Sequence, residues 1–201
     1  CYFVGQIMDS SIAYEKNSKK FLTHRNSSQV GFNIAKDWAG SFDLGTEILE
    51  VACGTGYPIT KELIKAGMKV WAIDSSPTLL SDFSSKFPNI PVACEKIQDA
   101  KLFDRKFDAA ISIGLVFLLS ENDQEIFFKK ISNTLRIDSR FLFTAPTRKG
   151  KWSDLTTGVE CHSLGFKKYK KILNTYGFKI IGRHVDAGRN NYYEVKKVAN
   201  P

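Results

Sequence analysis

Cysteine is scarce in this chain of 201 residues, and long apolar runs are absent. The four cysteines form no CxxC pair and are too few for a disulfide scaffold, so we expect a cytoplasmic protein in a reducing compartment. The longest apolar run, at 115–119, is far shorter than the ~18 residues that a membrane helix needs. The first residues lack a basic region followed by an apolar core, so the sequence predicts no signal peptide and no membrane partner.

The chain also lacks repeats, low-complexity tracts, internal linkers and His/Asp clusters at metal-ligand spacing. Hydrophobic content of 43% and charged content of 25% are ordinary for a globular protein, and the length suits one domain over residues 1–201. We expect a monomer or homodimer without a bound metal. The formal charge of +8 raises the question of nucleic acid. The densest basic run, Lys167–Lys171, is more often a solvated helix face than a phosphate-binding surface, so nucleic acid stays open as a partner but is not favoured.

The most informative stretch is 48–60, which has the pattern of a strand, a glycine turn and a helix. An apolar run from Ile48 to Val51 leads into Gly54-Thr-Gly56, and a helical pattern follows Pro58. Glycines in such a turn let backbone N–H groups approach a ligand, and the next helix directs its positive end toward it. A second apolar run ends in Asp74, a carboxylate 20 positions after Gly54 that can accept hydrogen bonds from ribose hydroxyls. The pattern predicts a nucleotide-like cofactor.

The same stretch distinguishes between cofactors. A nicotinamide fingerprint needs a third glycine where Ile59 stands, so that cofactor is not favoured. The run from Glu50 to Gly56, Glu-Val-Ala-Cys-Gly-Thr-Gly, instead resembles the first motif of class I S-adenosylmethionine-dependent methyltransferases. That family usually has glycine where Ala52 stands, and alanine is small enough to keep the turn. A Phe-Asp pair entering a buried apolar run, here at 107–108, is a second family feature. The resemblance implies S-adenosylmethionine as the cofactor.

The resemblance and the apolar patterns together predict the fold. The fold class is α/β, a Rossmann-like three-layer sandwich around a mostly parallel seven-stranded sheet with the last strand antiparallel. We expect the core at 45–201 and an N-terminal helical cap, which would act as a lid over the cofactor, at 1–44. The patterns predict strands at 48–51, 69–74, 91–94, 107–114, 141–145, 178–185 and 191–197. Helices are predicted at 9–40, with a break at 26–28 and Ser27 or Ser28 as N-cap, and at 60–66, 77–87, 120–136 and 164–176.

Candidate cofactor contacts come from the family positions. The resemblance places the glycine turn beside the ligand, Asp74 at the ribose, and residues 97–98 at the adenine. It places Tyr14 and Arg25 at the methionine end, although an amphipathic helix with Arg25 in solvent is the alternative. An acidic loop without a ligand is the alternative at 95–99. The expected cofactor-binding residues are Tyr14, Arg25, Glu50, Ala52, Cys53, Gly54, Thr55, Gly56, Asp74, Ser75, Ile97, Gln98 and Ile113.

The methyl acceptor is expected to bind beyond the fourth and fifth strands. The sequence there has neither the Asn/Asp-Pro-Pro-aromatic motif of base-amino methyltransferases nor a Pro-Cys nucleophile, and Ile113–Leu119 is apolar throughout. An apolar pocket favours a small-molecule acceptor, with Trp152, His162 and Tyr193 as candidate contacts. His162 is a candidate base, but a lone histidine is more often a surface residue, so no catalytic residue is assigned. An RNA or protein methyltransferase and a non-catalytic cofactor-binding module are the alternatives.

Overall fold

The centre of the protein is a seven-stranded sheet with the strand order β3-β2-β1-β4-β5-β9-β8. The computed structural model describes residues 9–25 and 30–201, without the side chains of residues 23–25. The first five strands are parallel, and β9 is antiparallel to both of its neighbours, β5 and β8. The strands are β1 (Glu47–Val51), β2 (Lys69–Asp74), β3 (Val92–Cys94), β4 (Phe107–Ser112), β5 (Leu135–Thr144), β8 (Phe178–Val185) and β9 (Asn191–Lys197). The predicted sheet is confirmed, including its antiparallel last strand.

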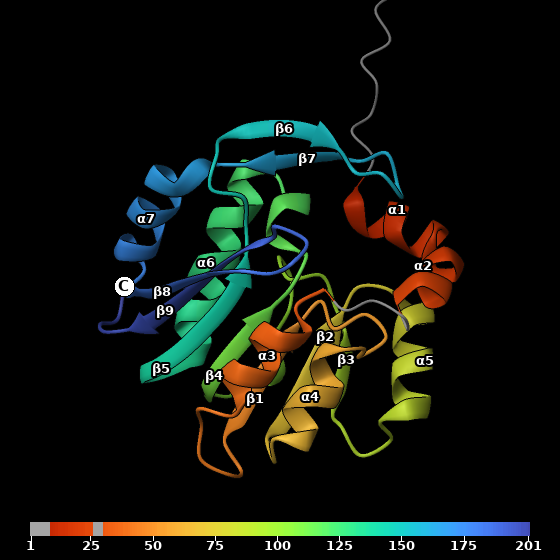
Figure 1. Ribbon diagram of the computed structural model, residues 1–201, viewed down its shortest axis with the longest axis horizontal. Helices are drawn as coiled ribbons and strands as arrows, with labels where there is room; N and C mark the ends of the chain where they lie inside the picture. The colour runs from red at the N-terminus through yellow and green to blue at the C-terminus, as the bar shows by residue number, and fades with distance from the viewer. Residues whose placement is uncertain (1–8, 26–29) are drawn as a thin grey trace, which may run out of the picture.

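Helices cover both faces of this sheet and make the three layers (Figure 1). One face carries α3 (Phe32–Ala39), α4 (Ile59–Lys65) and α5 (Pro77–Lys86), and the other carries α6 (Glu121–Thr134) and α7 (Gly165–Thr175). Central strands are apolar without alternation because both of their faces are buried; Ile48 and Leu49 on β1 are both 0% exposed. Helix α5 begins as predicted, since Ser76 Oγ accepts a hydrogen bond from Leu79 N (3.1 Å) and Pro77 follows at the first helical position.

The N-terminal segment forms two short helices, α1 (Ser10–Lys16) and α2 (Ser18–Arg25), beside α5 (Figure 1). The single helix predicted for this segment is therefore wrong in detail, because the chain turns at Asn17. The predicted N-caps, Ser27 and Ser28, lie outside the described residues. Helix α3 begins only at Phe32, with Gly31 as its N-cap in a left-handed conformation (φ 78°) that glycine adopts at low cost.

Two further differences from the predicted elements lie in the second half of the chain. Strand β5 begins at Leu135 instead of Phe141, because residues 137–139, between the predicted helix and the predicted strand, form a bulge in which Asp138 has φ 69°. A separate hairpin of β6 (Gly150–Ser153) and β7 (Glu160–Ser163) lies between β5 and α7. The β6 sequence, Gly-Lys-Trp-Ser, has no alternation of apolar residues that would indicate a strand, and all four residues are exposed. Two short 3-10 turns, η1 (Leu102–Asp104) and η2 (Val116–Leu118), complete the elements.

No helix within residues 9–25 and 30–201 is long and apolar enough to cross a membrane.

Candidate active site

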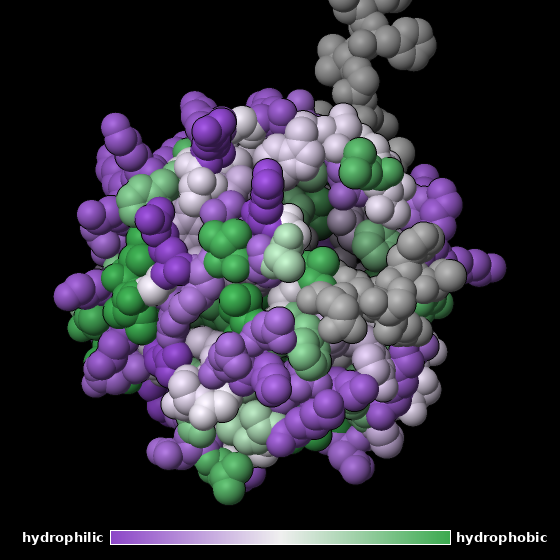
Figure 2. All heavy atoms as spheres, in the orientation of Figure 1, coloured by the Kyte–Doolittle hydropathy of each residue, from purple (hydrophilic) through white to green (hydrophobic). Residues whose placement is uncertain are grey.

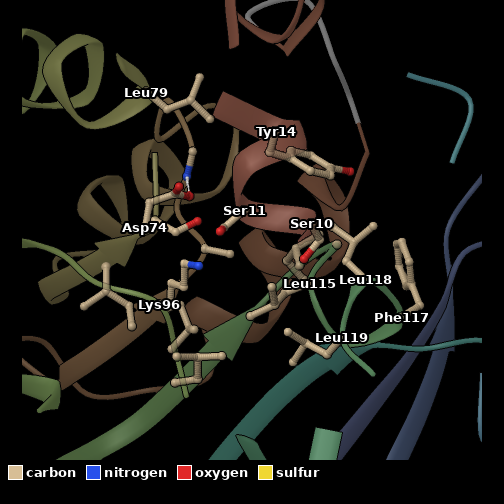
Figure 3. A pocket seen from close by; sticks show the side chains of 18 of the residues that line it. Ser10, Ser11, Tyr14, Asp74, Leu79, Lys96, Leu115, Phe117, Leu118 and Leu119 are labelled. Atoms are coloured by element: carbon tan, nitrogen blue, oxygen red, sulfur yellow. Dashed lines mark hydrogen bonds between the residues drawn. The ribbon is translucent and has the colours of Figure 1, made fainter. Parts of the chain in front are cut away.

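A cavity of about 270 Å³ lies at the carboxyl ends of β1, β2 and β4. The chain leaves β1 toward β2 and leaves β4 toward β5, in opposite directions along the sheet, and open α/β sheets bind their ligands at such a switch point. Figure 3 shows that Asp74 and Lys96 lie on one side of the cavity and Leu115, Phe117 and Leu118 on the other, with α1 beside them. Figure 2 shows a hollow on a largely hydrophilic face, with apolar side chains visible inside it. The cavity thus has a polar half and an apolar half.

The glycine turn between β1 and α4 forms one wall of this cavity. Ala52, Gly54 and Gly56 all have positive φ (61°, 56° and 79°), which bends the backbone sharply after the strand. A Cβ built on Gly54 would meet no atom within 4 Å, so the backbone at Gly54, which lines the cavity, is open to a ligand. Gly56 is required for a different reason, because a Cβ there would overlap the ring of Phe87 on the adjoining segment after α5. The two glycines of the motif therefore serve ligand access and packing, respectively.

Asp74 connects the end of β2 to the glycine turn. Its Oδ2 accepts a hydrogen bond from Gly54 N (2.8 Å), and its Oδ1 accepts one from Ser76 N (2.9 Å). The residue is 9% exposed, and burial raises the pKa of its carboxyl group even though these backbone donors oppose the shift. Each carboxylate oxygen can accept two hydrogen bonds, so acceptor capacity remains on Asp74 for hydroxyl groups of a ligand in the cavity.

Thr55 gives a direct test of whether this wall fits a polar ligand. The residue is 1% exposed and lines the cavity, and its Oγ1 has no hydrogen-bond partner among the described residues. A buried hydroxyl without a partner costs free energy, and a ligand that hydrogen-bonds to it removes that cost. The open backbone of Gly54, the hydroxyl of Thr55 and the carboxylate of Asp74 together fit the sugar and polar tail of a nucleoside cofactor.

The structure places nine of the expected cofactor-binding residues in the cavity wall: Tyr14, Ala52, Gly54, Thr55, Asp74, Ser75, Ile97, Gln98 and Ile113. Three others lie behind the wall. Glu50 is 4% exposed and accepts a hydrogen bond from Thr60 Oγ1 (2.6 Å), which ties β1 to α4. Cys53 packs with Leu80 and Phe83, and burial raises the pKa of its thiol. Gly56 packs against α5 as described. The side chain of Arg25 lies outside the described part of the chain.

The three candidate substrate contacts do not line the cavity. Trp152 on β6 packs on Phe117, with ring centroids 5.7 Å apart, and only Phe117 lines the cavity. His162 on β7 has its Nε2 3.2 Å from Glu160 Oε1, outside the cavity wall. Tyr193 is 0% exposed and stacks on Phe143 in the core, where burial raises its pKa to about 12. None of these three residues lines the cavity. The alternation of β7 and β9 directs His162 and Tyr193 elsewhere, and Trp152 on β6 reaches only the far side of Phe117.

Several cavity residues were missed by sequence reasoning. They come from the start of α1, from α2, from the turn before α3, from α5, from the segment after β3, from the hairpin and from the turn between β8 and β9. Their polar members are Asp9, Ser10, Ser11, Glu95, Lys96, Asp154 and Asn190, and their apolar members are Phe21, Val30 and Leu79. Glu95 and Lys96 adjoin residues 97–98, which the resemblance places at the adenine. No local pattern marks the others, because only the tertiary fold brings their segments to the strand ends. The apolar run after β4 does supply the apolar wall, as the sequence predicted.

Glycine in place of Ala52 is expected to raise the free energy of unfolding by about 1 kcal/mol. A non-glycine residue in the left-handed region costs about 1–2 kcal/mol, and the extra freedom of glycine in the unfolded chain cancels part of that gain. Equilibrium urea unfolding of the two proteins measures the difference. A destabilised Ala52→Gly variant would show that the backbone at this position is not strained.

Comparison with known proteins agrees with this geometry. A family described as "Methyltransferase domain" matches residues 48–138, somewhat less than half of the chain, and this segment contains the glycine turn, Asp74 and the 95–98 loop. No curated protein matches the chain.

Solved structures share the fold across nearly the whole chain. A S-adenosylmethionine-dependent methyltransferase from Clostridium acetobutylicum is 19% identical, with 92% of this chain and 99% of that chain covered and a TM-score of 0.69. Magnesium protoporphyrin IX methyltransferase from Synechocystis, with bound cofactor, is 15% identical, with 96% and 99% covered and a TM-score of 0.75. The 1,6-didemethyltoxoflavin-N1-methyltransferase from Burkholderia thailandensis, with bound 1,6-didemethyltoxoflavin and S-adenosylhomocysteine, is 13% identical, with 94% of this chain and 85% of that chain covered and a TM-score of 0.71. Residues 48–138 thus match a methyltransferase domain, and the chain as a whole has the fold of solved S-adenosylmethionine-dependent methyltransferases.

Proposed function

We propose that the enzyme transfers the methyl group of S-adenosylmethionine to a small-molecule acceptor that binds in the apolar half of the cavity. The observation that carries this proposal is the continuity of one cavity from the glycine turn to Leu115, Phe117 and Leu118. A wall of apolar side chains with a few polar groups is typical of small-ligand sites. Two of the structural neighbours are named for small acceptors, magnesium protoporphyrin IX and 1,6-didemethyltoxoflavin, which is consistent with the proposal.

The residues of the cavity wall have distinct proposed roles. Asp74 binds the ribose hydroxyls, Ile97 and Gln98 contact the adenine, and the backbone at Gly54 lies against the cofactor. Tyr14, with Arg25, is assigned to the methionine end. The cofactor brings a reactive methyl group, so the chain needs only to hold the acceptor in line with it and exclude water. No residue is assigned as a general base.

The organisation of the chain is part of the same proposal. We assign residues 45–201 to the catalytic core and residues 1–44 to a cap, within one methyltransferase domain. Acidic side chains outnumber basic ones in the described cavity wall, since Asp9, Asp74, Glu95 and Asp154 face a single lysine, Lys96. This balance argues against a phosphate-rich acceptor and so against RNA. A cytoplasmic location fits the free thiols at the three described cysteines.

An acceptor screen tests the proposal. The purified enzyme is incubated with S-adenosylmethionine and a panel of small amines, phenols and carboxylic acids, and formation of S-adenosylhomocysteine is followed by mass spectrometry. We expect turnover with at least one small compound. Turnover with total RNA or a protein extract, but with none of the small compounds, would contradict the proposed acceptor class.

Alanine in place of Glu15 is expected to loosen α1 and to speed the release of S-adenosylhomocysteine severalfold. The Glu15 carboxylate accepts hydrogen bonds from Ser76 Oγ and from Thr78 Oγ1 (2.5 Å), which hold α1 at the start of α5. These bonds lower the pKa of Glu15, Ser76 contributing most. Stopped-flow dissociation and hydrogen exchange of the α1 amides measure the effect. Unchanged exchange in α1 would show that Glu15 does not fix the helix; Glu125→Ala, on the far helix α6, is the control.

A further inference from the structure

The β6–β7 hairpin is the part of the structure added to the seven-stranded sheet, and it borders the apolar half of the cavity. Strand β7 contacts η2, and Trp152 on β6 packs on Phe117, which itself lines the cavity. Cys161, the β7 residue paired with Trp152, is fully buried, so the hairpin packs firmly on the rest of the protein. Residues at the base of its turn are therefore held in place beside the acceptor wall.

Asp154 is the hairpin residue that lines the cavity. Its Oδ1 accepts hydrogen bonds from Thr156 N (3.1 Å), Thr157 N (2.8 Å) and Thr157 Oγ1 (2.7 Å). Its backbone N–H donates to Val159 O (2.8 Å), which closes the turn. Among the described residues, none donates a hydrogen bond to Oδ2 and none forms an ion pair with this carboxylate. One oxygen thus fixes the side chain, and the other is left for a ligand.

The hydrogen-bond and ion-pair partners of Asp154 differ from those of the other acids of the wall. Asp9 is neutralised by Lys96, with their charged atoms 2.5 Å apart. Glu95 accepts a hydrogen bond from Lys101 N (3.0 Å), and Asp74 from Gly54 N and Ser76 N. Asp154 alone among these four acids receives hydrogen bonds only from within its own turn, and it belongs to the element that supports Phe117. A carboxylate beside an apolar wall complements a ligand that has an apolar body and a cationic group, and it repels an anionic one.

We propose that Asp154 determines acceptor specificity and that the acceptor is a small apolar molecule with an amine that is protonated at neutral pH. This inference rests on the proposed function and adds the chemical class of the acceptor to it. The carboxylate holds the ammonium group, and the wall formed by Leu115, Phe117 and Leu118 covers the apolar body.

Calorimetric titration of the enzyme saturated with S-adenosylhomocysteine tests this proposal. The probes are phenyl, indolyl and naphthyl ethylamines, each with the acetate of the same ring as its matched anion. We expect at least one amine to bind about tenfold or more tightly than the matched acetate. Asp154→Asn should abolish that preference, because the amide keeps an oxygen for the turn but carries no charge.

Glu160→Gln is the matched control, since it removes the same charge from the same hairpin at a residue outside the cavity wall. This variant should keep the preference of the unmodified enzyme for the amine. Equal or tighter binding of the acetates, a preference that survives Asp154→Asn, or no binding of any amine would overturn the proposal. Each protein is first titrated with S-adenosylhomocysteine alone, because failure of that step counts against the proposed function and not against the role of Asp154.

Discussion

Asparagine in place of Asp74 is expected to weaken binding of S-adenosylhomocysteine about 30-fold or more, on the order of 2 kcal/mol. The proposed ribose contact loses its charged acceptor. The amide also places an NH₂ group against one of two backbone donors, Gly54 N or Ser76 N, which loosens the turn that contacts the cofactor. Isothermal calorimetry measures the loss. Asp82→Asn on α5 is the matched control, because Asp82 pairs with Lys86 and lies outside the cavity wall.

The pH dependence of binding gives a second, independent signature of Asp74. The ionised carboxylate is the form that accepts hydroxyl donors, so affinity is full above the pKa of Asp74 and falls as the pH drops through it. Burial raises that pKa above the ordinary value of 3.8, so the loss of affinity begins at a higher pH than for an exposed aspartate. The Asp74→Asn variant should lack this component. Equal affinity of the variant and the original enzyme across the pH range would place the ribose elsewhere.

Alanine in place of Gly56 is expected to lower the free energy of unfolding by about 3 kcal/mol. The positive φ of 79° costs a residue with a Cβ about 1–2 kcal/mol. The added methyl group would also overlap the ring of Phe87 and lie 3.0 Å from Phe83 Cδ2, and overpacking of this kind costs about 1–3 kcal/mol. Phe83 is fully buried, so it has little room to move away. Equilibrium denaturation measures the change.

Gly54→Ala is the informative comparison for Gly56→Ala. Gly54 also has a positive φ, but its Cβ would meet no atom within 4 Å, so only the backbone strain of about 1–2 kcal/mol is expected. The new methyl group would instead stand at the cavity wall and reduce cofactor affinity. If both variants lost the same stability, the packing of Gly56 against α5 would not be what makes glycine necessary there.

The sheet was predictable because its strands have strong local patterns. The apolar run of β4 and the end of β2 at Asp74 can be read directly from residue types, since strands buried on both faces are continuously apolar. The sequence did not predict β6 because its residues are all exposed and lack an apolar pattern. The predicted range of β5 was too short because Asp138 interrupts its apolar pattern. In both places tertiary pairing, rather than local preference, forms the strand.

The cofactor side of the cavity was also easier to predict than the acceptor side. Gly54 and Asp74 lie at strand ends that the apolar patterns predict, and the family resemblance placed residues 97–98 at the adenine. Tyr193 was placed among the acceptor contacts, yet the alternation of β9 turns it into the core against Phe143. Asp154 lies in a turn of the hairpin, and no sequence pattern links such a turn to a cavity formed by distant segments. Cavity residues of this kind can therefore be identified only in the folded structure.

The most direct test of the account is a calorimetric titration of the purified enzyme with S-adenosylhomocysteine, with NAD as the control ligand. We predict micromolar binding of S-adenosylhomocysteine, about −8 kcal/mol, and no binding of NAD. Binding of NAD, or no binding of S-adenosylhomocysteine at millimolar concentration, would contradict the assignment of the glycine turn, Thr55 and Asp74 to this cofactor.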